Sequence, residues 1–276
     1  MKVQRFIDEF GCMGDGGPNN RAPTTPAEPG SVLEFDKEVE EGLSDSKQSK
    51  YRTGVGILLH MMRWSRPDVL NAVRELSCHM QVAGKKCFKA LTRVMNFIVD
   101  TKDKGYTLKP RYPATWDGKR DKKFRIHGKC DSEYAKHKSR RSVNAGMIYL
   151  EWAIIKQFSK MMPIVALSTT EAELYSAVLT AQDMMFVYHI MINMGLQILL
   201  PMILYSDNKG AVDLANNWSV GGRTRHMDVK QNFLRELKGN GFIKVEWLSG
   251  DNITPDMHTK NVPKKLFDKY GSEIVS

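Results

Sequence analysis

The sequence has few cysteines and no long run of apolar residues. Its 276 residues include four cysteines, with no CxxC pair and without the tight spacing of a disulfide scaffold. We therefore expect reduced thiols in an intracellular protein, with neither a disulfide framework nor a zinc site. No apolar run approaches the roughly 18 residues that would span a bilayer. The opening residues MKVQRFIDEF are too charged for a secretory signal, so secreted and membrane-spanning classes are not expected.

Basic residues outnumber acidic residues, although the general composition is that of an ordinary globular protein. Apolar residues make up 42% of the sequence and charged residues 26%, which argues against a fibrous or largely disordered chain. Lys and Arg total 41 against 31 Asp and Glu, so the formal net charge is +10. Such an excess predicts a polyanionic partner, most commonly nucleic acid. The alternative is a soluble protein that is merely basic.

The first part of the chain is predicted to be an extended segment followed by a small helical region. Residues 11–31 are rich in Gly and Pro and lack apolar periodicity, so we assign residues 1–50 to an extended linker. Within residues 51–110, apolar residues recur at steps of three or four, which is typical of amphipathic helices. The three stripes are Tyr51, Val55, Leu58 and Met62; Val69, Val73, Leu76 and Met80; and Phe88, Leu91, Met95 and Ile98. We interpret them as a helical core rather than a cofactor site.

A basic linker at residues 111–123 precedes a second domain at residues 124–276, in which strands are predicted as well as helices. The predicted strands are Phe124–Cys130, Asn144–Leu150, Pro163–Leu167, Met202–Ser206 and Phe242–Leu248. Ser168 and Glu171 form an S-x-x-E capping box that predicts the start of a long helix, and Gly195 predicts its end. Shorter helices are predicted at Lys209–Asn216, at Val229–Lys238 and from about Pro255. This order indicates an α/β domain with a mixed five-stranded sheet and flanking helices.

Four acidic residues lie where this layout would bring them together. Asp131 follows the first strand, Glu173 lies in the first turns of the long helix, and Asp207 follows the strand that ends at residue 206. Asp256 opens the last helix. Ligands of α/β sheets gather at such strand ends and helix starts. Clustered carboxylates repel one another unless a cation compensates them, and Mg²⁺ prefers oxygen ligands. Two such ions, about 3.5–4 Å apart, could flank a phosphodiester.

Several motifs in the second half resemble those of one family. Residues 165–174, VALSTTEAEL, closely resemble the RNase H signature of copia-type retrotransposons, usually written VALSSTEAEY. Residues 205–211, YSDNKGA, are similar to that family's YCDNQSA. Residues 223–228, RTRHMD, resemble its RTKHID and are followed by a helix that contains FLRE. The motifs occur in the family's order.

The first half carries further likenesses to the same family. Three segments are similar to parts of the family's Pol polyprotein that lie between the polymerase core and RNase H. They are Thr25–Gly30, Tyr51–Gly56 and Arg66–Asp68. The resemblance therefore covers nearly the whole chain, which looks like the C-terminal part of a reverse transcriptase in a copia-type Pol polyprotein. The YVDD-type aspartate pair of the polymerase palm is absent from the sequence, so polymerisation by this chain is not expected.

The resemblance assigns the four acids as metal ligands. Asp131, in GKCD, stands where the family has GYSD, and Asp207 matches the aspartate of its CDN motif. For the second ligand the sequence offers Glu171 or Glu173; the capping box accounts for Glu171, whereas Glu173 matches the AE(L/Y) core. Asp256 matches the closing N-x-x-A-D element, with proline in place of the usual alanine. The alternative for each acid is a solvated side chain or a helix cap.

The resemblance also implies an activity, cofactors and partners. It implies an RNase H-like fold and endonucleolytic, two-metal hydrolysis of the RNA strand in RNA–DNA hybrids. Two Mg²⁺ ions are the expected cofactors, with Mn²⁺ as a substitute. The expected partners are the hybrid and the polymerase part of the same polyprotein. An intracellular location follows, in a cytoplasmic virus-like particle with access to the nucleus.

Four further residues are predicted to contact the substrate. Arg140 and Arg141 lie in a basic turn near Asp131, where they could contact phosphates. Asn208 and His226 belong to the matching motifs. The alternatives are a solvated hairpin tip for the arginines and a structural or helix-capping role for His226.

Two other functions remain open from the sequence. One is a catalytically silent nucleic-acid-binding remnant of a truncated retrotransposon Pol. The other is an integrase-type nuclease on a related fold. The acids of an integrase follow an Asp–Asp–Glu order, whereas this chain has Asp–Glu–Asp–Asp, which favours RNase H.

Overall fold

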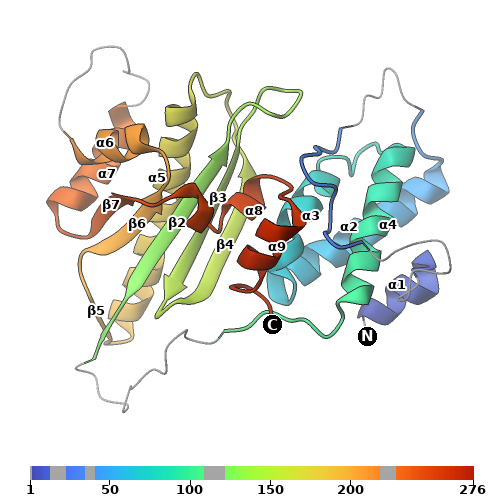
Figure 1. Ribbon diagram of the computed structural model, residues 1–276, viewed down its shortest axis with the longest axis horizontal. Coiled ribbons are helices and arrows are strands. Elements are labelled where there is room, and N and C mark those ends of the chain that lie inside the picture. The colour runs from blue at the N-terminus through green and yellow to red at the C-terminus, as the bar shows by residue number, and fades with distance from the viewer. Residues whose placement is uncertain (1, 13–22, 35–40, 109–121, 218–227) are drawn as a thin grey trace. The chain divides into compact units, whose positions relative to one another are not determined.

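The computed structural model describes residues 2–12, 23–34, 41–108, 122–217 and 228–276 (Figure 1). The chain forms two compact units, one of residues 1–107 with 260–276 and the other of residues 108–259. The sequence placed residues 260–276 with the second domain, whereas they pack in the first unit. Among the described residues, no helix is long and apolar enough to cross a membrane.

The first unit is helical. Its elements are α1 (Lys2–Phe10), α2 (Asp45–Trp64), the 3₁₀ helix η1 (Pro67–Val69), α3 (Leu70–Ser77), α4 (Lys85–Asp100) and α9 (Lys264–Gly271). The three predicted apolar stripes pack in one core, in which Met62, Met80 and Phe88 are only partly buried, whereas Met61 is buried. Residues 2–10 were expected to be extended but form α1, because Phe6 is fully buried in that core. Phe267 of α9 packs edge-to-face on Phe97 at 5.6 Å.

The second unit contains a mixed five-stranded sheet, as the sequence predicts. Its strands are β2 (Ile126–Glu133), β3 (Val143–Leu150), β4 (Ala153–Met161), β6 (Met202–Ser206) and β7 (Ile243–Trp247), in the order β4-β3-β2-β6-β7. β2, β3 and β4 pair antiparallel, whereas β6 is parallel to β2 and β7 is parallel to β6. A separate parallel pair joins β1 (Lys123–Phe124) to β5 (Gln197–Ile198).

The predicted third strand is wrong. Pro163–Leu167 is irregular, with Ile164, Val165 and Leu167 exposed, so these apolar residues do not mark a strand. The third strand is instead Ala153–Met161, which follows β3 after Glu151 and Trp152. Both turn residues have positive φ, 47° and 69°. This conformation suits two-residue hairpins and normally selects Asn or Gly, so Glu151 and Trp152 do not mark a turn in the sequence.

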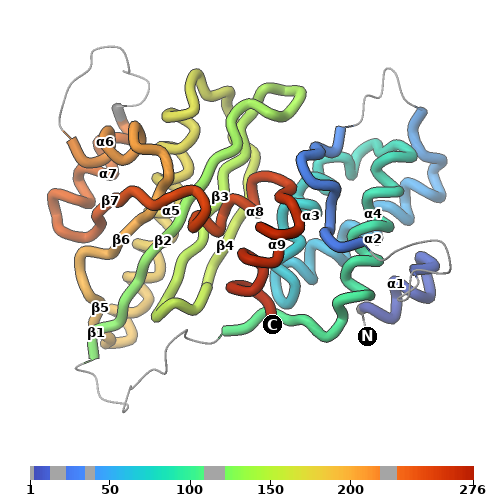
Figure 2. The backbone as a smooth tube through the Cα atoms, in the orientation of Figure 1, coloured from blue at the N-terminus to red at the C-terminus, as the bar shows by residue number. Residues whose placement is uncertain are grey.

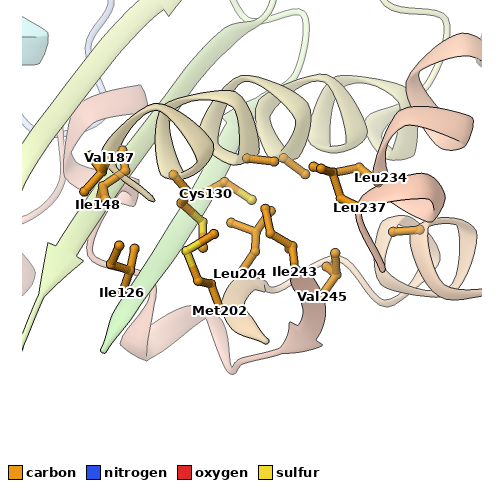
Figure 3. Close-up of a cluster of buried hydrophobic side chains, with 14 of the residues drawn as sticks. Ile126, Cys130, Ile148, Val187, Met202, Leu204, Leu234, Leu237, Ile243 and Val245 are labelled. Carbon is orange, nitrogen blue, oxygen red and sulfur yellow. The ribbon is translucent and has the colours of Figure 1, made fainter. Parts of the chain in front are cut away.

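Helices α5 (Thr169–Asn193), α6 (Lys209–Asn216) and α7 (Asp228–Gly239) enclose the core with one face of the sheet (Figures 1 and 2). Figure 3 shows Cys130, Leu204 and Ile243, from three strands, in the same cluster as Leu234 and Leu237 of α7. Strands β2 and β3 approach α5 closely at glycines. A Cβ on Gly146 would lie 2.3 Å from Thr180 Oγ1, so no larger residue fits there unless its neighbours move.

Helix α5 begins and ends as its sequence predicts. The Glu171 backbone N–H donates to Ser168 Oγ at 3.1 Å, and the Glu171 carboxylate accepts from the Leu167 N–H at 2.7 Å. Gly195 follows the helix with φ +76°, a conformation that glycine adopts without strain. Helix α8 (Asp256–Thr259) lies on the other face of the sheet, where Ser159 Oγ donates to the His258 carbonyl at 2.6 Å.

Candidate metal centre

Three of the four predicted acids come together at the edge of the sheet where β6 ends. One carboxylate oxygen from each of Asp131, Glu173 and Asp207 lies within 4.8 Å of the others. Asp131 and Glu173 are buried and Asp207 is partly buried. A strand, a helix start and a strand end thus each contribute one acid, and the three could hold a metal ion.

Asp131 is fixed through both its backbone and its side chain. It lies within β2, two residues before the strand ends, and Ser176 Oγ of α5 donates to its carbonyl oxygen at 2.8 Å. The hydroxyl of Thr259 donates to Asp131 Oδ2, and it lies 3.0 Å from the carbonyl oxygen of Asp256. Thr259 is almost completely buried. Helix α8 therefore reaches Asp131 through a threonine.

Glu173 and Glu171, the two alternatives for the second ligand, have different surroundings. Glu173 Oε1 accepts from the backbone N–H of Ser132 at 3.1 Å, which holds the carboxylate against the end of β2. The Glu171 carboxylate instead accepts from the Leu167 N–H at the start of α5. Glu171 therefore stabilises the start of α5, whereas Glu173 lies with Asp131 and Asp207.

Asp207 directly follows β6 and is held by neighbours from β7 and the loop after it. Its carbonyl oxygen accepts from Trp247 Nε1 at 2.9 Å. A Cβ on Gly250 would lie 3.1 Å from Asp207 Oδ2, so the loop backbone passes close to the carboxylate. Asn208 caps α6, because its Oδ1 accepts from the Ala211 N–H at 2.9 Å.

The remaining predicted residues have varied positions. Asp256 is the first residue of α8 and is not part of the group of three described acids. Arg140 and Arg141 are exposed in the loop between β2 and β3, and Arg140 has φ +58°. His226 lies outside the described residues.

The thiol of Cys130, next to Asp131 in the sequence, is completely buried. Burial raises the pKa of the Cys130 thiol well above its usual range, and the nearby carboxylates of Glu173 and Asp131 raise it further. Cys130 is therefore a neutral packing residue. Lys129 directs its ammonium to Thr254 Oγ1, at 2.9 Å.

Sequence reasoning missed the residues that hold the acids in place. Thr259 lies three residues, about one helical turn, after Asp256. This spacing is the sequence feature that could have indicated that Thr259 lies near the acids. Trp247 ends a strand parallel to the one that precedes Asp207, so its nearness follows from the sheet order. The contact from the Ser132 N–H cannot be predicted from residue type, because every residue except proline has a backbone N–H.

No protein-family model matches the chain. It is 27% identical over 252 residues to the retrovirus-related Pol polyprotein from transposon RE1 of Arabidopsis thaliana, covering 91% of this chain and 16% of that protein. It is 28% identical over 219 residues to the retrovirus-related Pol polyprotein from transposon TNT 1-94 of Nicotiana tabacum, covering 79% of this chain and 16% of that protein. The chain is related to copia-type retrotransposon Pol polyproteins. It spans about one sixth of the length of these relatives.

Solved structures similar to this chain include RNase H domains. The N-terminal RNase H domain of rv2228c from Mycobacterium tuberculosis, solved as a maltose-binding-protein fusion, is 12% identical, with a TM-score of 0.35 over 54% of this chain and 96% of that one. LC11-RNase H1 in complex with an RNA/DNA hybrid is 11% identical, with a TM-score of 0.39 over 52% and 98%. The predicted mixed five-stranded sheet with flanking helices is confirmed.

Proposed function

We propose that this chain is the RNase H of a copia-type Pol polyprotein and hydrolyses the RNA strand of RNA–DNA hybrids endonucleolytically. The observation that carries the proposal is the cluster of Asp131, Glu173 and Asp207, whose carboxylate oxygens lie within 4.8 Å of one another. The relatedness to Pol polyproteins and the net charge of +10 support a nucleic-acid substrate.

The donor set fits a hard divalent cation. At separations of no more than 4.8 Å, each pair of ionised carboxylates repels by at least about 3 kcal/mol at an effective dielectric constant of about 20. A divalent cation removes this repulsion, and an all-oxygen set suits Mg²⁺, with Mn²⁺ as a substitute. When bound, two such ions would stabilise charge on the scissile phosphate and make the attacking water more acidic. We assign Asp131, Glu173 and Asp207 as the ligands, with Asp256 as the fourth.

The chain's own contribution is to hold these acids in place before the substrate arrives. Thr259 fixes one oxygen of Asp131, the Ser132 N–H fixes one oxygen of Glu173, and the Trp247 indole fixes the backbone at Asp207. Such supporting contacts lower the cost of reorganisation during the reaction. In this proposal Asp256 approaches the same centre from α8, which Thr259 ties to Asp131.

The hairpin between β2 and β3 supplies positive charge near the centre. Arg140 and Arg141 are both exposed there, and we propose that they contact phosphates of the hybrid. Replacing both with alanine should weaken hybrid binding and make the dependence of log K on log[salt] shallower by about two. An unchanged affinity and salt dependence would show that the hairpin tip is merely solvated.

Cleavage of an end-labelled hybrid in Mg²⁺ tests the activity. The intact chain should cut the RNA strand and leave RNA–RNA and DNA–DNA duplexes intact, and chelation should stop the reaction. Asp207→Asn should abolish cleavage. Asp213→Asn is the matched control, because the same chemical change falls on an exposed residue of α6. A folded chain that binds hybrid without cutting it would instead support a silent remnant.

A further inference from the structure

Trp247 ends β7 with about half of its side chain exposed, at the edge of the sheet that carries the acids. Its exposed fraction is 49%, whereas Ile243 and Val245 of the same strand are buried. Strands β2, β6 and β7 are parallel, so their carboxyl ends meet at the edge where Asp131 and Asp207 lie. A large aromatic ring is thus exposed beside the proposed catalytic centre.

Two contacts fix the orientation of this ring. The indole N–H donates to the Asp207 carbonyl oxygen at 2.9 Å, and the strand register pairs Trp247 with Ser206. The ammonium of Lys209, an exposed residue at the start of α6, lies 5.1 Å from the ring centroid. A flat apolar surface and a positive charge therefore lie together, next to the backbone of Asp207.

A nucleotide backbone unit has the complementary chemistry, because it combines an apolar sugar face with a phosphate. Bases inside a duplex stack on one another, so their faces are covered, whereas sugars and phosphates remain accessible. The two strands of a hybrid differ at the 2′ carbon of the sugar, which carries a hydroxyl in RNA and only hydrogens in DNA. Covering a hydroxyl with an apolar ring costs free energy unless it is hydrogen-bonded. The ring therefore favours a deoxyribose.

We propose that Trp247 and Lys209 form a subsite for one deoxynucleotide of the DNA strand. The indole ring packs on the deoxyribose, and the ammonium pairs with an adjacent phosphate. This inference rests on the proposed function, because it takes the hybrid as substrate. If Trp247 only covers the core, changing its ring alters folding stability and leaves hybrid binding unchanged.

Fluorescence anisotropy with a labelled hybrid tests the subsite. Binding to the full chain is measured without divalent cation, so that it does not depend on cleavage. Trp247→Ala should weaken hybrid binding about tenfold, the loss expected when roughly 50 Å² of apolar surface is no longer buried. Binding to an RNA duplex of the same sequence should change less than about twofold. An unchanged hybrid affinity, or an equal loss on both duplexes, overturns the proposal.

Further variants distinguish the contributions of the Trp247 ring, its N–H and the Lys209 charge to hybrid binding. Trp247→Phe keeps a flat ring and should retain hybrid affinity within about threefold. Trp247→Leu lacks the flat ring and replaces the alanine variant if that one unfolds, with the same expected loss. Lys209→Gln should make the salt dependence shallower by about one, as for the loss of one phosphate contact. Its control is Lys160→Gln, an exposed lysine over Phe158 on the opposite edge strand.

Cleavage in Mg²⁺ is measured separately on the unmodified chain. Hybrid binding that responds to Trp247 and Lys209 as predicted supports the subsite even if no cleavage occurs, and the proposed function alone then fails. If Lys209→Gln leaves the salt dependence unchanged, the phosphate contact is wrong whether or not the chain cuts RNA.

Discussion

Replacing Thr259 with valine would test whether α8 holds Asp131 in its ligating position. The two side chains have nearly the same shape, so the change removes the hydroxyl that donates to Asp131 Oδ2 and little else. Because Thr259 is 2% exposed, water cannot easily replace that hydroxyl. The carboxylate then loses a hydrogen bond of the charged type, whose net contribution is about 1.5–3 kcal/mol.

The consequence should appear in metal binding. Loss of a contact that orients a ligand typically lowers metal affinity about 10- to 100-fold, and 1.5–3 kcal/mol corresponds to about the same range. Isothermal titration calorimetry with Mg²⁺ and the Mg²⁺ dependence of single-turnover cleavage would both report it. At saturating Mg²⁺, the cleavage rate of Thr259→Val should recover most of the native value.

Thr259→Ser is the matched control, since it keeps the hydroxyl and removes a methyl group. Serine should bind Mg²⁺ within about threefold of threonine. The reasoning is refuted if valine binds Mg²⁺ as tightly as threonine, or if serine and valine lose affinity equally. The second result would mean that packing of the methyl group, and not the hydrogen bond, holds α8 in place.

Three further substitutions have definite expectations. Gly250→Ala places a Cβ 3.1 Å from Asp207 Oδ2 and should weaken metal binding about tenfold, with urea unfolding of the metal-free chain unchanged. Gly146→Ala places a Cβ 2.3 Å from Thr180 Oγ1 and should destabilise folding by about 1–3 kcal/mol, seen as a lower urea midpoint. Burial lowers the pKa of His127 from 6.5 to about 3, so the unfolded chain takes up a proton that the folded chain does not. Stability should fall by about 1.4 kcal/mol per pH unit as pH drops below 6.5, and His127→Phe should remove that part of the slope.

Much of the second unit could be predicted from local sequence signals. The capping box at Ser168, the glycine after α5 and the buried strand before Asp207 each act over a few residues, and the structure has them where expected. Strand β4 was missed because its turn uses Glu151 and Trp152 in a conformation that usually selects Asn or Gly. The apolar residues 163–167 gave a false strand signal, since they are exposed.

The arrangement around the acids could be predicted only in part. Strand ends and a helix start place Asp131, Glu173 and Asp207 at one edge, because the sheet topology brings those positions together. The contact between Thr259 and Asp131 spans 128 residues, so no local pattern encodes it. The role of Asp256 as fourth ligand and the absence of polymerase activity stay predictions.

Metal binding by glutamine variants of Glu171 and Glu173 shows whether the cluster of acids is a metal centre. Free Mn²⁺ is measured by electron paramagnetic resonance during titration of the native chain, Glu173→Gln and Glu171→Gln. We expect Glu173→Gln to lose most of its Mn²⁺ affinity. Glu171→Gln should bind Mn²⁺ as tightly as the native chain. Its free energy of unfolding should be lower, because the Glu171 carboxylate accepts a hydrogen bond from the Leu167 N–H at the start of α5. Equal Mn²⁺ affinity in the native chain and Glu173→Gln would contradict the assignment of this cluster as the metal centre.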